Sequence, residues 1–322
     1  MTIARAGLCC ALTMLATLLG PSAQAADKVV AGSLGGQAPL WAIYVAIHKG
    51  FFAAENLDLE LNFAQSGAAV TQQLTGGSLD VALSVGISDP IHAIEKGAPL
   101  ALIRIVGNAA PYILIAKPSI KTFADLKGKT ISSGAPNDVT NAYLVRMMMA
   151  NGLKKDDYEI ISAGVAAARY AALKAGVADA AIVLPPLNFV ANAGGFNTIG
   201  FAADFVKDLP FTGMAVHRRW AAANMSAAKR VLAATDKSVA WLANPANRAE
   251  AVELLVKHAK STKENAEASY DFLRRIDYFE PGSKVSRKRL QNVIDTEKAA
   301  GNIDKSFALE RVAMPGLTEL TD

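Results

Sequence analysis

The chain has 322 residues and carries 33 Lys and Arg against 29 Asp and Glu, a net charge of +4. Basic and acidic residues are interleaved along its length, so this small excess does not indicate a nucleic-acid-binding protein. The two cysteines, Cys9 and Cys10, both fall within the first 25 residues. Once those residues are removed, disulfides, thiolate nucleophiles and cysteine-ligated zinc are excluded.

Residues 1–25 have the three-part layout of a secretory signal peptide. Arg5 gives a positive start, residues 8–19 form an uncharged apolar run, and the small-residue site Ala23-Gln24-Ala25 follows. The apolar run is shorter than the roughly 20 residues needed to span a bilayer, which argues against a membrane anchor. No twin arginine is present within residues 1–25. We therefore expect export to the periplasm by the general secretory route and cleavage after Ala25.

Short apolar runs alternate with helical patterns from residue 28 to residue 217. A buried helix closed by Gly50 is expected at 39–50. Strands that alternate with helices indicate crossover units and largely parallel sheets. The expected strands are 28–34, 57–63, 78–85, 99–107, 111–117, 128–133, 158–164 and 178–184.

Beyond about residue 218 the strand signal stops and helical patterns follow. Their limits are marked by Asn244-Pro245, by a candidate capping box from Ser261 to Glu264, and by Gly301. The expected helices are 226–243, 247–260, 263–276 and 288–301.

Two segments, 73–85 and 172–184, align without a gap. Each is typical of a helix end, a glycine turn and an aspartate that leads into a buried strand. Because the pattern occurs twice in similar surroundings, we expect two copies of one α/β plan, and so two lobes with a cleft between them. The matched pairs are Leu74 with Leu173, Gly77 with Gly176, Asp80 with Asp179, and Ala82 with Ala181.

Several motifs point to a known family. Residues 49–60 read KGFFAAENLDLE, a Gly-Ala helix start follows at 67, and residues 74–82 read LTGGSLDVA. This series resembles the periplasmic solute-binding proteins of ABC importers, in particular the NMT1/THI5-like group with its SsuA-like, nitrate- and taurine-binding members. Residues 120–132 and 171–186 match the second half of that pattern, so the resemblance covers about residues 28–217.

The resemblance implies an α/β protein with the type II periplasmic-binding fold, in which two α/β lobes surround a ligand cleft and a helical C-terminal region packs on lobe 1. Lobe 1 would begin with residues 26–110, lobe 2 would hold 111–209, and residues 210–322 would return to lobe 1. The segment from Asn108 to Pro111 is a suitable hinge, because a few loop residues can absorb the backbone change of closure. The implied partners are a small-molecule solute and an ABC permease in the inner membrane, with no nucleic acid, and we expect a monomer.

Ligands of open α/β sheets bind beyond the carboxyl ends of the strands. That rule selects the loops 33–39, 64–70, 85–90, 132–140 and 184–188, where glycines allow close approach and helix N-termini favour an acceptor or an anion. The family resemblance places ligand contacts in the same loops. The candidate ligand-binding residues are Gly35, Gly36, Gln37, Trp41, Ser66, Gly67, Ala68, Gly86, Ile87, Ser88, Ser133, Gly134, Asn137, Thr140, Pro186, Asn188 and Thr212.

Some of these residues have structural alternatives. Ser66 and Ser88 are suited to capping a helix, and Asp89 and Asp138 are interpreted as caps because a carboxylate would repel an anionic solute. Trp41 belongs to an apolar helix, so core packing competes with an aromatic pocket wall.

Arginine would suit the capture of a carboxylate or a sulfonate. Arg104, Arg146 and Arg169 are the candidates, although none lies in an expected strand-end loop. The charge of the ligand is therefore left open.

No enzyme, metal or cofactor is expected. The four histidines are widely spaced, and neither a Gly-x-Ser-x-Gly elbow nor a phosphate loop occurs. No carboxylate pair sits in a sequence setting apolar enough to raise a pKa for acid–base work. Related pyrimidine synthases of thiamine biosynthesis carry a cysteine cluster, which the expected mature chain lacks.

The sequence therefore predicts a solute-binding component of an ABC import system. It would capture a sulfonate, a carboxylate or a similar small solute by lobe closure. A periplasmic sensing module that reports to a membrane receptor and a thiamine-pyrimidine-precursor binding protein are the alternatives.

Overall fold

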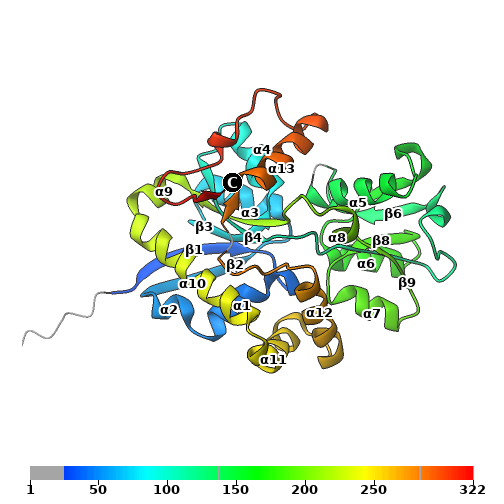
Figure 1. The fold of residues 1–322 in the computed structure, drawn as a ribbon, viewed down its shortest axis with the longest axis horizontal. Helices are drawn as coiled ribbons and strands as arrows, with labels where there is room; N and C mark the ends of the chain where they lie inside the picture. The colour runs from blue at the N-terminus through cyan, green and yellow to red at the C-terminus, as the bar shows by residue number, and fades with distance from the viewer. Residues whose placement is uncertain (1–24, 137, 283, 322) are drawn as a thin grey trace, which may run out of the picture.

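The computed structural model describes residues 25–136, 138–282 and 284–321. The expected signal peptide, apart from Ala25, lies outside the described residues. Two lobes, each built on a five-stranded sheet, lie side by side along the longest axis of the molecule (Figure 1). Among the described helices, none combines the length and the apolar character that a membrane span requires.

The sheet of lobe 1, sheet A, is mixed. Strand β1 runs parallel to β2 and β3, whereas β10 runs antiparallel to both β3 and β4. All eight residues of β4 are buried, as expected for a strand covered on both faces. The order across sheet A is β2 (Leu57–Phe63), β1 (Asp27–Ser33), β3 (Val81–Gly86), β10 (Thr212–His217) and β4 (Leu100–Gly107).

The sheet of lobe 2, sheet B, repeats this layout. Strand β6 runs parallel to β7 and β8, and the reversed strand β5 lies between β8 and β9. Strand β9 was not among the expected strands, because its residues are all half-buried and show no alternation. The order across sheet B is β7 (Glu159–Ser162), β6 (Thr130–Ser133), β8 (Ala180–Val183), β5 (Ile113–Ala116) and β9 (Asn197–Phe201).

Helices cover both sheets. Those of lobe 1 are η1 (Ala38–Leu40), α1 (Trp41–His48), α2 (Phe51–Ala54), α3 (Gly67–Gly76) and α4 (Ser88–Glu95). Those of lobe 2 are η2 (Ala124–Leu126), α5 (Val139–Ala150), η3 (Lys155–Asp157), α6 (Ala166–Lys174), α7 (Leu187–Ala193) and α8 (Ala202–Phe205). The C-terminal region adds α9 (Arg218–Ala223), α10 (Met225–Ala243), η4 (Pro245–Asn247), α11 (Arg248–Ala259), α12 (Lys263–Arg275), β11 (Val285–Ser286), α13 (Arg287–Ala299), η5 (Leu309–Arg311) and β12 (Leu320–Thr321).

The C-terminal helices α10 and α11 pack on α1 of lobe 1 (Figure 1). Ser238 of α10 donates a hydrogen bond to the carbonyl oxygen of Ala42. The expectation of helices alone after residue 218 is wrong in one respect, because β11 and β12 pair as a small parallel sheet. The cap of α12 is Thr262 rather than Ser261, since the Thr262 hydroxyl accepts from Asn265 N at 3.2 Å.

The expected duplication is confirmed at atomic level. Asp80 N donates to Val30 O at 2.8 Å, and Asp80 Oδ2 accepts from Val30 N at 2.8 Å. Asp179 makes the same exchange with Thr130, at 2.8 and 3.1 Å. In both lobes this aspartate ties the start of one strand to the neighbouring strand.

The glycine before each of these aspartates has a backbone reason as well. Gly77 and Gly176 have φ of 78° and 77°. In this left-handed region a glycine ends a helix without the strain that a Cβ would bring. The two lobes therefore turn from helix to strand in the same way.

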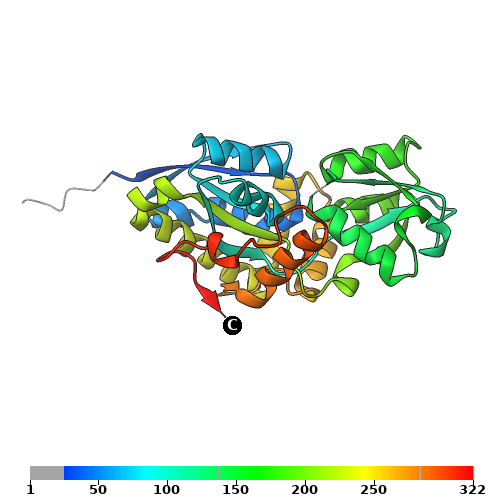
Figure 2. The same cartoon turned by 90° about the horizontal axis from the view of Figure 1, so that it is seen from above.

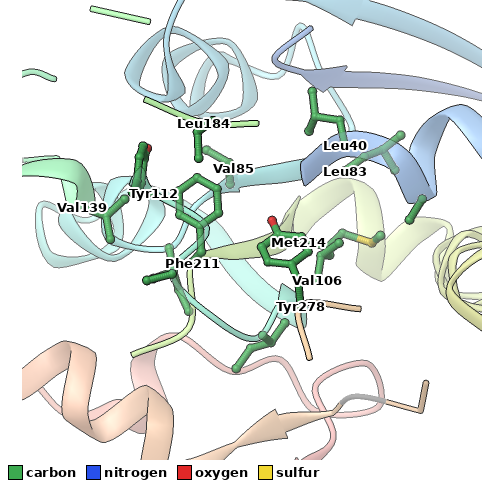
Figure 3. Close-up of a cluster of buried hydrophobic side chains, with 14 of the residues drawn as sticks. Leu40, Leu83, Val85, Val106, Tyr112, Val139, Leu184, Phe211, Met214 and Tyr278 are labelled. Carbon is green, nitrogen blue, oxygen red and sulfur yellow. The ribbon is translucent and has the colours of Figure 1, made fainter. Parts of the chain in front are cut away.

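Two chain crossings join the lobes, one between β4 and β5 and the other before β10. Buried aromatic side chains gather around them, with the Phe211 ring in the middle of the group (Figure 3). The Phe211 ring centroid lies 5.1 Å from that of Tyr112, and Tyr143 Oη donates to Pro210 O at 2.8 Å. The view from above shows lobe 2 projecting as a separate body beyond these crossings (Figure 2).

Candidate ligand-binding site

A cavity of about 90 Å³, named here the central pocket, lies between the lobes. Because roughly 10–15 Å³ is enough for one water molecule, the central pocket has room for a small solute. From lobe 1 it is lined by Leu34, Gln37, Pro39, Leu40, Ser66, Gly67, Ser84, Gly86 and Asp89. From lobe 2 and the return crossing it is lined by Tyr112, Ala135, Asp138, Val139, Thr140, Gly164, Val165, Arg169, Leu184, Phe211 and Thr212.

The position of the central pocket follows from the two sheets. Its lining includes the loops after β1, β2, β3, β6 and β7, so it lies at the carboxyl ends of parallel strands in both lobes. The lobes touch beside it, where Ala38 N donates to Pro185 O at 3.0 Å. The described pocket is therefore a partly enclosed space with walls from both lobes.

Helix α3 begins at the wall that lobe 1 contributes. The Ser66 hydroxyl accepts from Ala69 N at 3.1 Å, so Ser66 is the N-cap of α3, as the alternative interpretation had it. Gly67 and Gly86 lie against the carboxylate of Asp89, and a Cβ on Gly67 would collide with Asp89 Oδ2. A side chain at position 67 would therefore displace the Asp89 carboxylate from its present position.

Asp89 has a role that differs from its interpretation as a helix cap. It sits in the first turn of α4 with its side chain in the pocket wall, and it caps nothing. Burial raises the pKa of Asp89 to about 7, with a further increase from the negative charge of Asp138. The expectation that no carboxylate pair lies in a setting apolar enough to raise a pKa is therefore wrong for Asp89, which is buried and faces Asp138. Sequence spacing did not reveal this setting, because Asp138 comes from the other lobe.

Asp138 caps helix α5 on the lobe 2 side, as expected. Its Oδ1 accepts from Thr140 N at 2.8 Å and from Asn141 N at 3.3 Å, and its Oδ2 accepts from Ala135 N at 2.9 Å. A Cβ on Gly134 would collide with this carboxylate. Gly134 thus allows the 132–140 loop to close on its own cap.

Arg169, 4% exposed, forms part of the lobe 2 wall. Its Nε donates to Gly164 O at 2.7 Å and its Nη1 to Ile182 O at 3.0 Å. The guanidinium carbon lies 5.6 Å from the centroid of the Tyr112 ring. Burial raises the pKa of Tyr112, and this phenol accepts from Thr140 Oγ1 at 2.9 Å.

Two hydroxyl side chains complete the polar part of the lining. Ser84 is 1% exposed, and among the described residues its Oγ has no hydrogen-bond partner. Thr212 Oγ1 lies 3.3 Å from Tyr278 Oη. Buried hydroxyls normally have a partner, so the Ser84 hydroxyl is a group that a bound molecule could satisfy.

The structure brings together six of the predicted site residues in the lining, namely Gln37, Ser66, Gly67, Gly86, Thr140 and Thr212. Ten others lie outside the lining: Gly35, Gly36, Trp41, Ala68, Ile87, Ser88, Ser133, Gly134, Pro186 and Asn188. Asn137 lies outside the described residues.

Several of the ten residues outside the lining have structural partners. The Trp41 side chain is fully buried and its Nε1 donates to Ala251 O at 2.7 Å, which fits the core-packing alternative. Ser88 does not cap α4; its hydroxyl donates to Glu297 Oε1 at 2.5 Å. Ser133 Oγ donates to Asn141 Oδ1 at 2.5 Å and so orders the loop beside the pocket.

Of the three candidate arginines, only Arg169 lines the central pocket. Arg104 pairs with Asp236, and Arg146 pairs with Asp208 at 2.9 Å. None of the four residues of these ion pairs is part of the lining.

The lining residues that sequence reasoning missed follow a pattern. Gly164 and Val165 lie at the carboxyl end of β7, in a loop that is not among the five expected ligand loops. The equivalent loop of lobe 1, 64–70, is among them, so the duplication is the signal in the sequence that indicates Gly164. Tyr112 and Phe211 belong to the crossings, and no strand-end rule selects them.

Among the described residues, no group of three or more His, Cys, Asp or Glu side chains could hold a metal ion.

The family model described as NMT1/THI5 like matches residues 38–249, which is more than half of the chain. The chain belongs to the NMT1/THI5-like family. A Brucella abortus (strain 2308) protein named as a binding protein is 27% identical over 263 residues, 80% of both chains.

Two solved structures show the fold. The alkanesulfonate-binding protein SsuA of Xanthomonas axonopodis pv. citri, bound to MOPS, is 19% identical, with a TM-score of 0.74 over 93% of this chain and 100% of its own. The ligand-binding component of an ABC-type import system from Staphylococcus aureus, with zinc bound, is 14% identical, with a TM-score of 0.76 over 90% of this chain and 97% of its own. The type II periplasmic-binding fold is confirmed, with the helical C-terminal region on lobe 1.

The same fold also occurs outside binding proteins. A mutant of DszB in complex with biphenyl-2-sulfinic acid is 15% identical, with a TM-score of 0.64 over 90% of this chain and 96% of its own. The structural neighbours are mostly binding proteins, and DszB is an enzyme on the same fold.

Proposed function

We propose that this protein is the solute-binding component of an ABC import system. It captures a small solute between its lobes and delivers it to a permease in the inner membrane. The observation that carries this proposal is the central pocket, whose wall comes from both lobes and from the crossing that joins them. A wall of this kind is complete only when the lobes are together.

Ligand binding is coupled to lobe closure in this proposal. A solute that contacts both lobes only in the closed state shifts the population toward that state. The segments 108–111 and 206–211, between the two sheets, are the hinge. The lobes are residues 26–110 with 210–322, and residues 111–209. The permease then recognises the closed form.

The names of the structural neighbours support a transport role and a small ligand, and the first of them is named as an alkanesulfonate-binding protein. The sequence alone favours sulfonates and carboxylates as the solute, and the charge of the solute is considered below from the pocket itself. No catalytic step is proposed. The described lining offers no nucleophile with an adjacent base, since Asp138 is engaged in capping and Ser84 has no partner.

The signal peptide expected at residues 1–25 supports a location in the periplasm. A periplasmic sensing module is the alternative with the same closure, and it differs in its membrane partner. Reconstitution with the permease and measurement of ATP-dependent uptake separates the two.

A thermal-shift screen of residues 26–322 against small solutes tests the proposal. A solute at 100 times its Kd stabilises the folded state by roughly 2.7 kcal/mol. The same solute should reduce the radius of gyration in X-ray scattering, and mass spectrometry should recover it unchanged from denatured protein. The proposal fails if solutes of every charge class leave the melting temperature and the radius unchanged, or if the bound compound is recovered chemically altered.

A further inference from the structure

The carboxylate of Asp89 lies against backbone that leaves no room for another group behind it. Gly67 and Gly86 face its Oδ2, and a Cβ on Gly67 would collide with that oxygen. Asp89 belongs to the pocket lining, so the open side of the carboxylate faces the space between the lobes. Within the described ranges, the Asp89 carboxylate is part of no hydrogen bond or ion pair, whereas its neighbours Ser88 and His92 both bond to Glu297.

The charged groups around Asp89 come from four elements. Asp138 acts on it from the start of α5 in lobe 2, while His92 of α4 and Glu297 of α13 act from lobe 1. Arg169 of α6 lines the same pocket. Both acidic neighbours and the histidine are already engaged, because Asp138 accepts three backbone N–H groups and Glu297 Oε2 lies 2.8 Å from His92 Nε2.

The positive charge of Arg169 is directed into the protein. Its Nε and Nη1 are bonded to the carbonyl oxygens of Gly164 and Ile182, and its guanidinium faces the Tyr112 ring. These contacts hold the arginine in the wall of lobe 2, so it does not pair with Asp89. Among the described lining residues, the buried cation Arg169 therefore has its own hydrogen-bond partners, whereas the Asp89 carboxylate has none.

A second, independent feature points to a bound molecule at the same place. Ser84 is 1% exposed and lines the pocket on β3, and its hydroxyl has no partner among the described residues. Burying an unpaired hydroxyl costs free energy, which a ligand hydrogen bond would offset. The pocket lining therefore contains two groups without a hydrogen-bond partner among the described residues, the Ser84 hydroxyl and the Asp89 carboxylate.

We propose that the central pocket selects solutes with a protonated nitrogen, an ammonium or amidinium group, which binds the carboxylate of Asp89 between the lobes. This inference rests on the proposed function, and it replaces an anionic ligand by a cationic one. The reason is electrostatic, since an anion would enter a pocket that holds two carboxylates. A cationic N–H group gains a charge-assisted hydrogen bond there.

The same group links binding to closure. Asp89 belongs to lobe 1 and Asp138 to lobe 2, so their negative charges face each other when the lobes meet. A cation between them removes that repulsion in the closed state alone. Its differential interaction with the two states is what shifts the population.

The pH dependence of binding has a definite sign. Burial raises the pKa of Asp89 to about 7. A cation binds the ionised carboxylate, so its affinity rises with pH through this range, by up to about 10-fold between pH 6 and pH 8. An anionic ligand would favour protonated Asp89 and would bind more weakly as the pH rises.

The test uses calorimetry and thermal shift on residues 26–322 at pH 6, 7 and 8. The probes are ethylammonium, acetamidinium and benzamidinium as chlorides, with acetate, methanesulfonate and benzoate as sodium salts at equal ionic strength. We expect the cations to bind and to bind more tightly at pH 8. Asp89→Asn should weaken cation binding by about 10- to 100-fold, since a hydrogen bond to a charged group is lost.

Two further variants separate charge from structure. Asp138→Asn keeps a good N-cap, so it should weaken cation binding by a few-fold without unfolding α5. Asp58→Asn, an exposed position on β2 of the same lobe, should change neither affinity nor its pH dependence. Circular dichroism checks that each variant is folded.

The outcomes are distinct. If anions bind, more tightly at pH 6, and Asp89→Asn leaves or improves their affinity, the inference is overturned while the proposed function stands. If cations bind but Asp89→Asn and pH have no effect, the assignment to Asp89 is wrong. If no probe or other solute of either charge binds, both proposals fail together.

Discussion

The two lobes share a scaffold but not the chemistry that they present to each other. Asp80 and Asp179 make the same exchange with a neighbouring strand, at the same distance from a left-handed glycine. Helices α3 and α6 begin at equivalent places, yet the fourth residue is the buried Val70 in one and Arg169 in the other. The duplicated aspartates link neighbouring strands within each sheet. Arg169, which has no counterpart in lobe 1, lines the pocket.

The lobes also differ in how the C-terminal region holds them. Glu297 of α13 is 4% exposed and is hydrogen-bonded to Ser88, His92 and Asn302 at 2.5, 2.8 and 2.7 Å. Burial raises the pKa of this carboxyl, but the three hydrogen bonds outweigh burial and leave the pKa below its ordinary value. On the lobe 2 side, Thr296 accepts from Arg146 Nη2 at 3.0 Å at a part-buried position.

The largest expected effect comes from the hydrogen bonds by which Glu297 of α13 is attached to lobe 1. Glu297→Ala removes the hydrogen-bond partner of the buried Ser88 and of the half-buried His92 and Asn302, so we expect a loss of about 3–5 kcal/mol in the free energy of unfolding. Urea denaturation measures it, and hydrogen exchange should become faster in 285–321. Glu253→Ala, at an exposed position of α11, is the matched control and should stay within about 0.5 kcal/mol. Equal losses in the free energy of unfolding of the two variants would mean that Glu297 does not stabilise the packing of α13 on lobe 1.

The next effect concerns the position where the lobes diverge. Arg169→Val gives lobe 2 the residue that lobe 1 has at the equivalent place. We expect a loss of about 2–4 kcal/mol, because two charge-assisted hydrogen bonds and the contact with the Tyr112 ring disappear. Arg219→Val, at an exposed site on α9, is the control in the same denaturation experiment. If Arg169→Val leaves the free energy of unfolding unchanged, the difference between Val70 and Arg169 does not contribute to stability.

Replacing the two matched aspartates, Asp80 and Asp179, should have smaller effects of similar size in the two lobes. Asp80→Ala and Asp179→Ala should each cost about 1–3 kcal/mol, since each frees a strand N–H. A hydrogen bond from Lys117, at 2.7 Å, holds the pKa of Asp179 below its ordinary value. The contribution of Asp179 is therefore present above the ordinary aspartate pKa and lost as the pH falls through its lowered value.

Urea unfolding at pH 7 and at pH 3 checks this pair. The Asp179→Ala variant should approach wild type at the lower pH. Asn replacements at both sites keep an acceptor and serve as controls. A strongly unequal cost at pH 7 would show that the two turns are similar in shape but not in energy.

The smallest expected effect is a gain. The folded-state pKa of Asp89 is about 7, above its ordinary 3.8, so the stability given by the protonated form is lost as the pH rises from about 4 through about 7. Asp89→Asn should remove this loss and so be more stable than wild type at pH 8, with the difference vanishing near pH 4. Melting temperatures from pH 4 to pH 8 measure it, with Asp58→Asn as the control. A wild-type curve parallel to that of Asp89→Asn over this range would contradict the raised pKa.

The sequence predicted the scaffold well because its signals are local. The strand at 57–63 and the cap at Ser66 depend on neighbouring residues, and the duplicated Gly77 and Gly176 depend on one turn each. These features were expected within a residue or two. Strand β9 was missed because its half-buried residues carry no alternation.

The pocket was predicted only in outline, because its properties depend on contacts between distant parts of the chain. The sequence favours a capping role for Asp89, because nothing near it in sequence shows that Asp138 faces it. Ser88 was assigned to the site, yet its partner Glu297 lies 209 residues away. Tyr112 and Phe211 enter the lining through the crossings.

The reversed strand in each sheet has a consequence for the order in which the protein can be assembled. All five strands of sheet B lie within residues 113–201, whereas sheet A lacks its fourth strand until β10 arrives at 212–217. A polypeptide that emerges from its N-terminus thus completes the second sheet before the first. A fragment that ends at residue 209 contains every strand of sheet B. It lacks β10, so the edges of β3 and β4 that pair with β10 in sheet A would have no partner strand.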